Sequence, residues 1–401
     1  MLMLTFRSSL HHVVTITRRA LLTAALGTAL AAPGPVSAQP APLTTSSATP
    51  SSAKPSAKPV QAARHAADIA QARAVVVELM KAKQIPGLSI AVVSRGVIVW
   101  SEGFGLADVE QDVAVSPQTK FRVGSVSKML TVGAVARLVE SGQLDLDAPV
   151  QRYVPAFPAK PWPITTRQLT GHLAGIRHYG PNDNRFLDGA PHFESVTKSL
   201  TIFQDDPLNA EPGTAYAYSS YGWNLVAAVV EGASKEEFLR YMQNAVFDPL
   251  ELRNTTADQN AAITSHRTRF YVRDAGGALR NAPYVDNSYK WAGGGFLSTA
   301  DDLARYASAY LRPGFLRQDT LDLLFTSQKL RSGKETGVGI GWRIGADAKG
   351  RRIYHHGGSI EGGRAMLMIF PQSQLVVAIT ANLLANFGEP DAMRIGDLFI
   401  H

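Results

Sequence analysis

The sequence predicts an α+β fold, in which a sheet lobe carries a mainly helical lobe. Strand-like apolar runs occur near the start of the globular part, and strands return in the last part of the chain. Between them lies a long, mostly helical and loop-rich middle that extends to about residue 312. Strands at both ends with helices between them indicate one sheet into which a helical lobe is inserted. We expect a functional site in the cleft between the lobes.

The individual elements follow from apolar spacing. Residues 67–84 and 125–142 place apolar side chains at helical intervals, and each is predicted to form a helix with a buried face. Two β-rich runs flank Ser94, Arg95 and Gly96, which predicts a hairpin. A C-terminal helix is expected after the last strand. The late strands are expected at 337–345, 351–356, 364–371 and 374–382.

The first 64 residues differ in composition from the rest. Residues 1–38 contain a basic start with Arg18 and Arg19, then the apolar run 20–32, then small residues, which predicts an export signal cleaved after Ala38. The apolar run is shorter than the roughly 20 residues that a membrane span needs. The paired arginines suit a twin-arginine signal as well as a general one. The product would be periplasmic or secreted, without stable membrane insertion.

Residues 39–64 are predicted to be a disordered linker before a single globular domain at 65–401. Between residues 39 and 62, 18 of 24 positions are Pro, Ser, Ala or Thr, and none is aromatic. Such a segment buries too little apolar surface to offset the entropy lost on ordering.

Composition excludes several kinds of site. The chain has no cysteine, which excludes disulfides, thiolate zinc sites and a cysteine nucleophile. Its ten histidines show no H-E-x-x-H spacing, so we expect neither a metal nor an organic cofactor. The net charge of +7 falls to +4 without the three arginines of residues 1–38. Basic residues form no stripe with aromatics, and we expect no nucleic-acid partner. Oligomeric state is left open.

A serine and a lysine three residues apart occur three times, and context separates them. Ser51 and Lys54 lie in the predicted linker, where no fixed geometry is available. Ser195 and Lys198 lie on the polar side of a short helix whose other face is apolar. Ser125 and Lys128 follow Gly124 at the opening of a broad buried helix. Only this last pair is predicted to be catalytic.

The chemistry of Ser125 and Lys128 suits nucleophilic catalysis. The i,i+3 spacing places both side chains on one side of the helix. A neutral lysine can take the serine proton, provided that burial or nearby cations disfavour its charged form. The helix start offers free backbone N–H groups, including that of Ser125, to stabilise an oxyanion.

Two later segments carry a family resemblance. "YAYSSYGWN" places Tyr218 two residues before Ser220, and "YHHGG" ends a strand with His355, Gly357 and Gly358. Ser-x-x-Lys, Tyr-x-Asn and Lys/His-x-Gly, in that order, mark the penicillin-binding protein and serine β-lactamase superfamily. From about residue 70 onward, the chain resembles its branch of class C β-lactamases, D,D-peptidases and esterases. Residues 283–311 look closest to the mitochondrial serine β-lactamase-like proteins, whose function is peptide hydrolysis.

The resemblance implies a fold and a set of roles. The fold would be β-lactamase/transpeptidase-like, with an antiparallel sheet flanked by helices. Ser125 would be the acylated nucleophile, Lys128 the base or proton shuttle, and Tyr218 a second proton-transfer group that helps to activate the deacylating water. The backbone N–H groups of Ser125 and Gly358 would form the oxyanion hole. Ser220, His355 and Gly357 would bind the substrate, and Gly357 would allow close approach of strand and substrate.

Two positions depart from the family pattern. Ser220 replaces the usual asparagine, and its shorter side chain predicts that the contact to Lys128 or to a substrate amide is lost or bridged by water. His355 stands where many β-lactamases have lysine. Because unperturbed histidine is mostly neutral at pH 7, a substrate carboxylate would be held less strongly.

These departures favour a peptidase, amidase or esterase that forms an acyl-serine. A true β-lactamase and a non-catalytic scaffold that retains the fold are the alternatives.

Tyr218 could also be a core aromatic, although motif order favours catalysis. His172 and His356 are predicted to be structural, and residues 293–295 to provide close backbone packing near the cleft. "GGSIEGG" is not G-x-S-x-G, so an α/β-hydrolase nucleophile elbow is rejected.

Overall fold

An antiparallel seven-stranded sheet organises the described part of the chain. The structure is a computed structural model that describes residues 65–180, 183 and 191–401. The predictions for 1–38 and 39–64 lie outside these residues. The strand order is β3-β2-β1-β12-β11-β10-β9, so the first and last segments of the domain meet in the sheet centre. The strands are β1 (Gly87–Ser94), β2 (Val97–Asp108), β3 (Val113–Ala114), β9 (Arg343–Ala346), β10 (Arg352–Ile360), β11 (Gly363–Phe370) and β12 (Leu375–Ala381).

The central strand β1 is covered on both faces. Leu88, Ile90 and Val92 belong to one apolar cluster, whereas Ala91 and Val93 belong to another. This alternation is the period of two of an extended strand between two cores. The predicted hairpin forms between β1 and β2, where Arg95 and Gly96 both have positive φ, as a tight two-residue turn requires.

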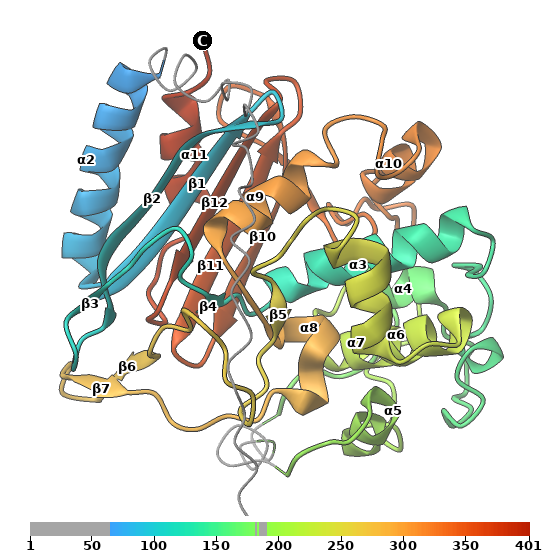
Figure 1. Ribbon diagram of the computed structural model, residues 1–401. Helices are drawn as coiled ribbons and strands as arrows, with labels where there is room; N and C mark the ends of the chain where they lie inside the picture. Colours follow the sequence, from blue (N-terminus) through green and yellow to red (C-terminus); the bar gives the residue numbers. More distant parts are fainter. Residues whose placement is uncertain (1–64, 181–182, 184–190) are drawn as a thin grey trace, which may run out of the picture. The chain divides into compact units, whose positions relative to one another are not determined.

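Helices cover each face of the sheet. α2 (Ala66–Lys83) and α11 (Glu389–Asp397) pack on one face, and α9 (Ala300–Ser308) crosses β1 and β12 on the other (Figure 1). α11 is the predicted C-terminal helix. No helix within the described residues is long and apolar enough to span a membrane. The arrangement confirms the predicted α+β fold.

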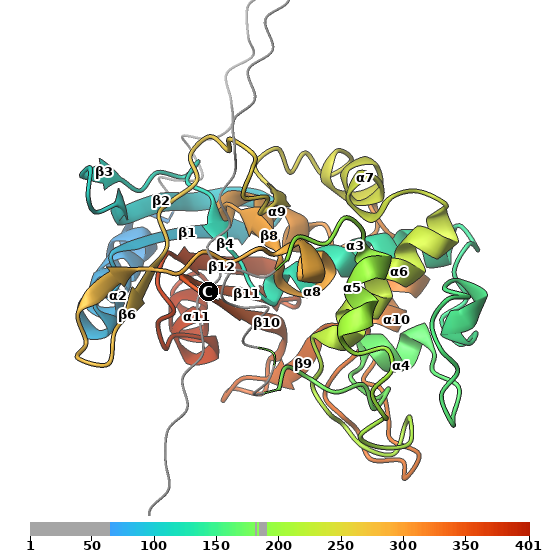
Figure 2. The ribbon, with the colours of Figure 1, turned by 90° about the horizontal axis from the view of Figure 1, so that it is seen from below.

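The helical lobe is inserted between β3 and β9. Its longest members, α3 (Val126–Glu140) and α6 (Tyr221–Ser234), are buried over most of their length. Figure 2 shows α3 and α8 (Trp291–Gly294) side by side, next to β10 and β11. The shorter helices and turns are α4 (Thr166–Thr170), α5 (Val196–Ser199), α7 (Phe238–Met242), α10 (Gln318–Leu324), η1 (Val150–Arg152), η3 (Leu200–Ile202), η4 (Gln243–Phe247) and η5 (Ser288–Lys290).

Short strands complete the structure. They are β4 (Phe121–Arg122), β8 (Phe296–Ser298) and β5 (Thr256–Ala257) in a three-stranded sheet, and β6 (Tyr271–Arg273) with β7 (Leu279–Asn281) in a two-stranded one. β4 leads directly into the residues before α3.

One predicted strand is shorter than expected. Of residues 337–345, only the part from Arg343 joins the sheet, as β9. Gly337 and Gly341 have φ of +69° and +76°. These left-handed conformations turn the chain, which prevents an extended strand before Arg343.

Candidate active site

Ser125 lies immediately before α3, in close contact with strand β10. Gly124, which precedes it, has φ +51°, and a Cβ there would lie 2.8 Å from the backbone nitrogen of Ser359. Glycine therefore permits both the backbone conformation and the approach of the helix start to the strand. The Ser125 side chain makes no capping hydrogen bond to α3. Its hydroxyl is free to face the rest of the site.

The structure separates this serine from the similar one before α5. Ser195 Oγ accepts the backbone N–H of Lys198 at 3.2 Å, which is an ordinary helix N-cap. Ser125 Oγ instead accepts hydrogen bonds from two side chains, Tyr218 Oη at 2.8 Å and Lys128 Nζ at 3.2 Å. The same local spacing thus serves a helix cap at one site and a polar cluster at the other.

Lys128 is fully buried in this cluster. Its Nζ donates to Ser125 Oγ, to Ser220 Oγ at 3.2 Å and to the Gly293 carbonyl at 2.7 Å. It forms no ion pair with a carboxylate of the described residues. Burial lowers the Lys128 pKa, and the Arg343 charge lowers it further against the opposing effect of Tyr218. This environment favours a neutral amine that can accept a proton.

Tyr218 completes the contact with Ser125. Burial by itself would raise the pKa of the Tyr218 phenol, but its interactions with Lys128, Ser125 and Ser220 outweigh burial, so the pKa is lowered. The ring packs 4.4 Å from that of His172, centroid to centroid. The lowered pKa values of both Tyr218 and Lys128 suit an exchange of one proton between them.

Ser220 keeps the direct contact that we expected to be lost. Its Oγ lies 3.2 Å from Lys128 Nζ, and the side chain is almost completely buried. The shorter side chain suffices because Ser220 is the residue just before α6, which packs against α3 and so brings the hydroxyl close to the lysine. The prediction of a lost or water-bridged contact to Lys128 is therefore wrong in this structure.

Two histidines hold the loop that carries Tyr218 and Ser220. The backbone N–H of Ser219 donates to His172 Nδ1, and that of Ser220 donates to His178 Nδ1, both at 3.2 Å. Burial lowers the pKa of His172 well below its usual value and that of His178 to about 4. Each ring is therefore neutral at pH 7 and can accept these hydrogen bonds. His172 has the structural place predicted for it, whereas the sequence offered no signal for His178.

Strand β10 forms one wall of the site. A Cβ on Gly358 would lie 1.9 Å from the Val123 carbonyl, so glycine is required for the strand to meet the start of α3. A Cβ on Gly357 would meet no other residue closer than 3.7 Å, and this residue lines the pocket. The close approach between protein segments thus belongs to Gly358, and Gly357 leaves space for a ligand. His356 is buried, and its Nδ1 contacts the Gly357 carbonyl at 2.7 Å.

A pocket of about 510 Å³ opens beside Ser125, Tyr218 and Ser220. His355 lines it with its Nε2 3.5 Å from a carboxylate oxygen of Glu389. Burial lowers the His355 pKa despite this carboxylate, so the ring is neutral at pH 7. The positive charge of the pocket comes instead from two residues that the sequence motifs did not indicate, Arg343 and Arg364. Neither forms an ion pair with a carboxylate of the described residues.

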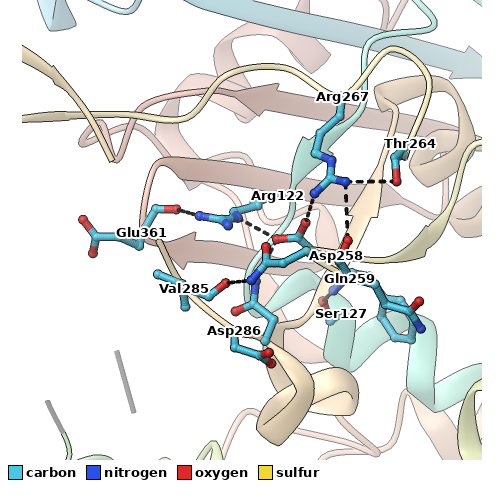
Figure 3. Close-up of polar contacts among 12 residues, drawn as sticks. Arg122, Ser127, Asp258, Gln259, Thr264, Arg267, Val285, Asp286 and Glu361 are labelled. Atoms are coloured by element: carbon cyan, nitrogen blue, oxygen red, sulfur yellow. Dashed lines mark hydrogen bonds and ion pairs between the residues drawn. The ribbon is translucent and has the colours of Figure 1, made fainter. Parts of the chain in front are cut away.

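A buried ion pair anchors the segment that leads into Ser125. Arg122 Nε lies 2.7 Å from Asp258 Oδ2, and its Nη1 donates to the Glu361 carbonyl in the β10–β11 turn at 3.0 Å (Figure 3). Arg267 and Asn287 also contact Asp258, at 3.4 and 2.8 Å. The cluster therefore ties β4 to the end of β10, so that the segment leading into Ser125 and strand β10 are held together.

The site residues come from three parts of the chain. The structure brings together Ser125 and Lys128 at the start of α3, Tyr218 and Ser220 before α6, and His355, Gly357 and Gly358 on β10. Residues 293–295 contribute the carbonyl that contacts Lys128, in keeping with the predicted packing near the cleft. Arg343, Arg364, Glu389 and His178 belong to no recognisable motif, and only the fold places them in the pocket.

Known proteins are similar to this chain in sequence and fold. The Beta-lactamase family model matches residues 72–398. The human "Serine beta-lactamase-like protein LACTB, mitochondrial" is 34% identical over 378 residues, covering 72% of this chain and 69% of that protein. The octameric penicillin-binding protein homologue of Pyrococcus abyssi aligns with a TM-score of 0.68 at 25% identity, over 79% of this chain and 73% of that one.

A more distant structure shows the same fold. A D-stereospecific amidohydrolase from Streptomyces sp. aligns with a TM-score of 0.68 at 21% identity, over 83% of this chain and 98% of that one. The fold is therefore β-lactamase/transpeptidase-like, as the sequence motifs predicted, and the predicted likeness to the mitochondrial serine β-lactamase-like proteins is confirmed.

Proposed function

This chain belongs to the β-lactamase family, and we propose that it is an exported serine hydrolase that cleaves an amide, peptide or ester bond through an acyl-serine. The observation that carries the proposal is the double contact of Ser125 Oγ with Tyr218 Oη and Lys128 Nζ, at 2.8 and 3.2 Å. Lys128 is buried without a carboxylate partner among the described residues, which favours the neutral base that such chemistry needs.

The proposed acylation begins with loss of the Ser125 proton to neutral Lys128, directly or through Tyr218. Ser125 Oγ bonds to the substrate carbonyl carbon, and the backbone N–H groups of Ser125 and Gly358 stabilise the oxyanion. The bond to the leaving amine or alcohol then breaks as the Lys128–Tyr218 pair returns the proton to it. For deacylation, a water molecule attacks the ester, gives one proton to the same pair, and Ser125 recovers it.

The charges in the pocket bear on the substrate. Many β-lactamases have a lysine at the position of His355. A substrate carboxylate bound here would instead meet the neutral His355 ring and the negative Glu389, whose carboxylate oxygen lies 3.5 Å from His355 Nε2. This arrangement disfavours β-lactams and supports the peptidase, amidase or esterase assignment. Arg343 and Arg364 line the same pocket without carboxylate partners among the described residues, which keeps a β-lactamase as the second candidate.

Active-site labelling separates the candidates. The purified chain is incubated with a fluorophosphonate and, separately, with a fluorescent penicillin, and the modified residue is located by mass spectrometry. We expect the phosphonate to label Ser125, and the penicillin to be turned over slowly or not at all. Rapid penicillin turnover would identify a β-lactamase. Failure of both reagents to modify Ser125 would favour a non-catalytic scaffold.

Export is a separate part of the proposal, supported by the basic, apolar and small-residue order of residues 1–38. The human relative carries "mitochondrial" in its name, so location has to be measured for this chain. Cell fractionation with N-terminal sequencing of the mature protein should find it outside the cytoplasm and starting at Gln39. An intact N-terminus in the cytoplasmic fraction would contradict export without affecting the hydrolase assignment.

A further inference from the structure

We propose that His65, Asp68 and His401 form a zinc-binding site separate from the active site. His65 lies just before α2, Asp68 lies in the first turn of α2, and His401 follows α11. One nitrogen of each ring and one carboxylate oxygen lie within 4.8 Å of one another. Among the described residues, it is the one group of three histidine or carboxylate side chains with ligand atoms this close together.

The ligand atoms converge on a single place. His65 Nδ1 and His401 Nε2 lie 2.9 and 3.0 Å from the same oxygen, Asp68 Oδ2. A tetrahedral zinc ion with bonds of about 2.0–2.2 Å separates neighbouring ligand atoms by about 3.3 Å. Small outward rotations of the side chains would therefore admit the ion. Two imidazoles and a carboxylate are ligands that zinc takes, and the fourth position would be left for water.

The surroundings hold the site in shape and leave it accessible. The side chains of His65 and Asp68 are only 17% and 13% exposed, whereas that of His401 is 68% exposed. Phe399 packs 5.6 Å from the His65 ring, and Trp100 stacks on Phe399. A cavity of about 770 Å³ reaches both histidines. An ion can thus enter from the cavity, while the apolar wall restricts the His65 ring.

Zinc at this place would act on stability and not on turnover. It would join two segments that are 333 residues apart, next to helices that pack on the same face of the sheet. The cavity shares no lining residue with the pocket beside Ser125. Binding only to the folded chain raises its thermal midpoint, by about 5 °C at a zinc concentration near 100 times Kd.

The test uses the untagged chain after treatment with a chelator. Zinc binding is measured by isothermal titration calorimetry, and the thermal midpoint is measured with and without zinc. Cobalt is added as a second probe, because tetrahedral cobalt has a visible spectrum. We expect one zinc per chain, a higher midpoint with zinc, and a cobalt spectrum that disappears in His401→Ala.

The matched control is His192→Ala. His192 pairs with Asp286 at 3.0 Å but is not part of a three-ligand group within the described residues. It should bind zinc like the parent chain, whereas His401→Ala and Asp68→Asn should bind at least about tenfold more weakly. Because the His401 side chain is exposed, we expect His401→Ala to fold. The thermal midpoint of this variant without zinc checks that it does. Absence of stoichiometric zinc binding by the parent chain, or equal binding by His401→Ala, would overturn the proposal.

Discussion

Arg122 and Lys128 lie on either side of Ser125 in the sequence, and both are buried basic side chains, but their surroundings differ. The Arg122 and Asp258 side chains are 4% and 0% exposed, and they form an ion pair at 2.7 Å (Figure 3). Lys128 is equally buried but has serine hydroxyls and a carbonyl as its hydrogen-bond partners. A carboxylate partner stabilises the charged form of a buried basic group, whereas burial without such a partner disfavours the charged form and lowers the pKa, as for Lys128.

Replacing Lys128 by methionine should have the largest effect on activity. We expect hydrolysis of a p-nitrophenyl ester to fall by about 10²–10⁴-fold, because the proposed general base is lost. The free energy of unfolding, measured in urea, should stay the same or rise, since an apolar side chain replaces a buried lysine that has no carboxylate partner. A large loss of stability would show that Lys128 is a structural residue like Arg122.

Arg122→Met is the matched change on the other side of Ser125. It leaves Asp258 buried with Arg267 as its remaining cation, at 3.4 Å. Removing one partner of a buried pair typically costs 3–5 kcal/mol, and we expect about 3 kcal/mol in the free energy of unfolding. Urea unfolding measures this value. An unchanged unfolding free energy would mean that the cluster in Figure 3 does not stabilise the start of α3.

The pH dependence of ester hydrolysis should follow the neutral form of Lys128. Activity should rise with pH up to the Lys128 pKa and then level off, below the usual lysine range, because burial lowers that pKa. Tyr218 raises the Lys128 pKa and Arg343 lowers it. The rise should therefore move to lower pH in Tyr218→Phe and to higher pH in Arg343→Gln. Shifts of kcat/KM profiles in the same direction for both variants would contradict this account.

Ser220→Ala should have the smallest effect. It removes one of the three acceptors of Lys128, at 3.2 Å, and leaves the contacts to Ser125 and Gly293. A hydrogen bond of this kind contributes about 0.5–1.5 kcal/mol, which corresponds to an approximately 2–10-fold loss of kcat. A loss as large as that of Lys128→Met would instead place Ser220 in the proton transfer itself.

The parts of the site that the sequence predicted are those with local spacing or family order. Ser125 and Lys128 are one helical turn apart, and the tyrosine and histidine motifs follow them in a recognisable sequence. Arg343, Arg364 and Glu389 could not be predicted in this way, because each lies in a different segment and enters the pocket only when β9, β11 and α11 are placed. The contact between Ser220 and Lys128 likewise depends on the packing of α6 against α3.

The sequence by itself determined the α+β class and the order of the strands along the chain, because apolar periodicity is a local property of the backbone. It also singled out Ser125 and Lys128 from the three pairs with i,i+3 spacing, through the buried helix that follows them and the order of the later motifs. The tertiary structure alone decided which cations have carboxylate partners, and hence which amine can lose its proton. It also decided which histidines meet, since His401 reaches His65 and Asp68 from the other end of the domain. Burial and charge pairing depend on residues far apart in the chain, so local sequence patterns cannot predict them.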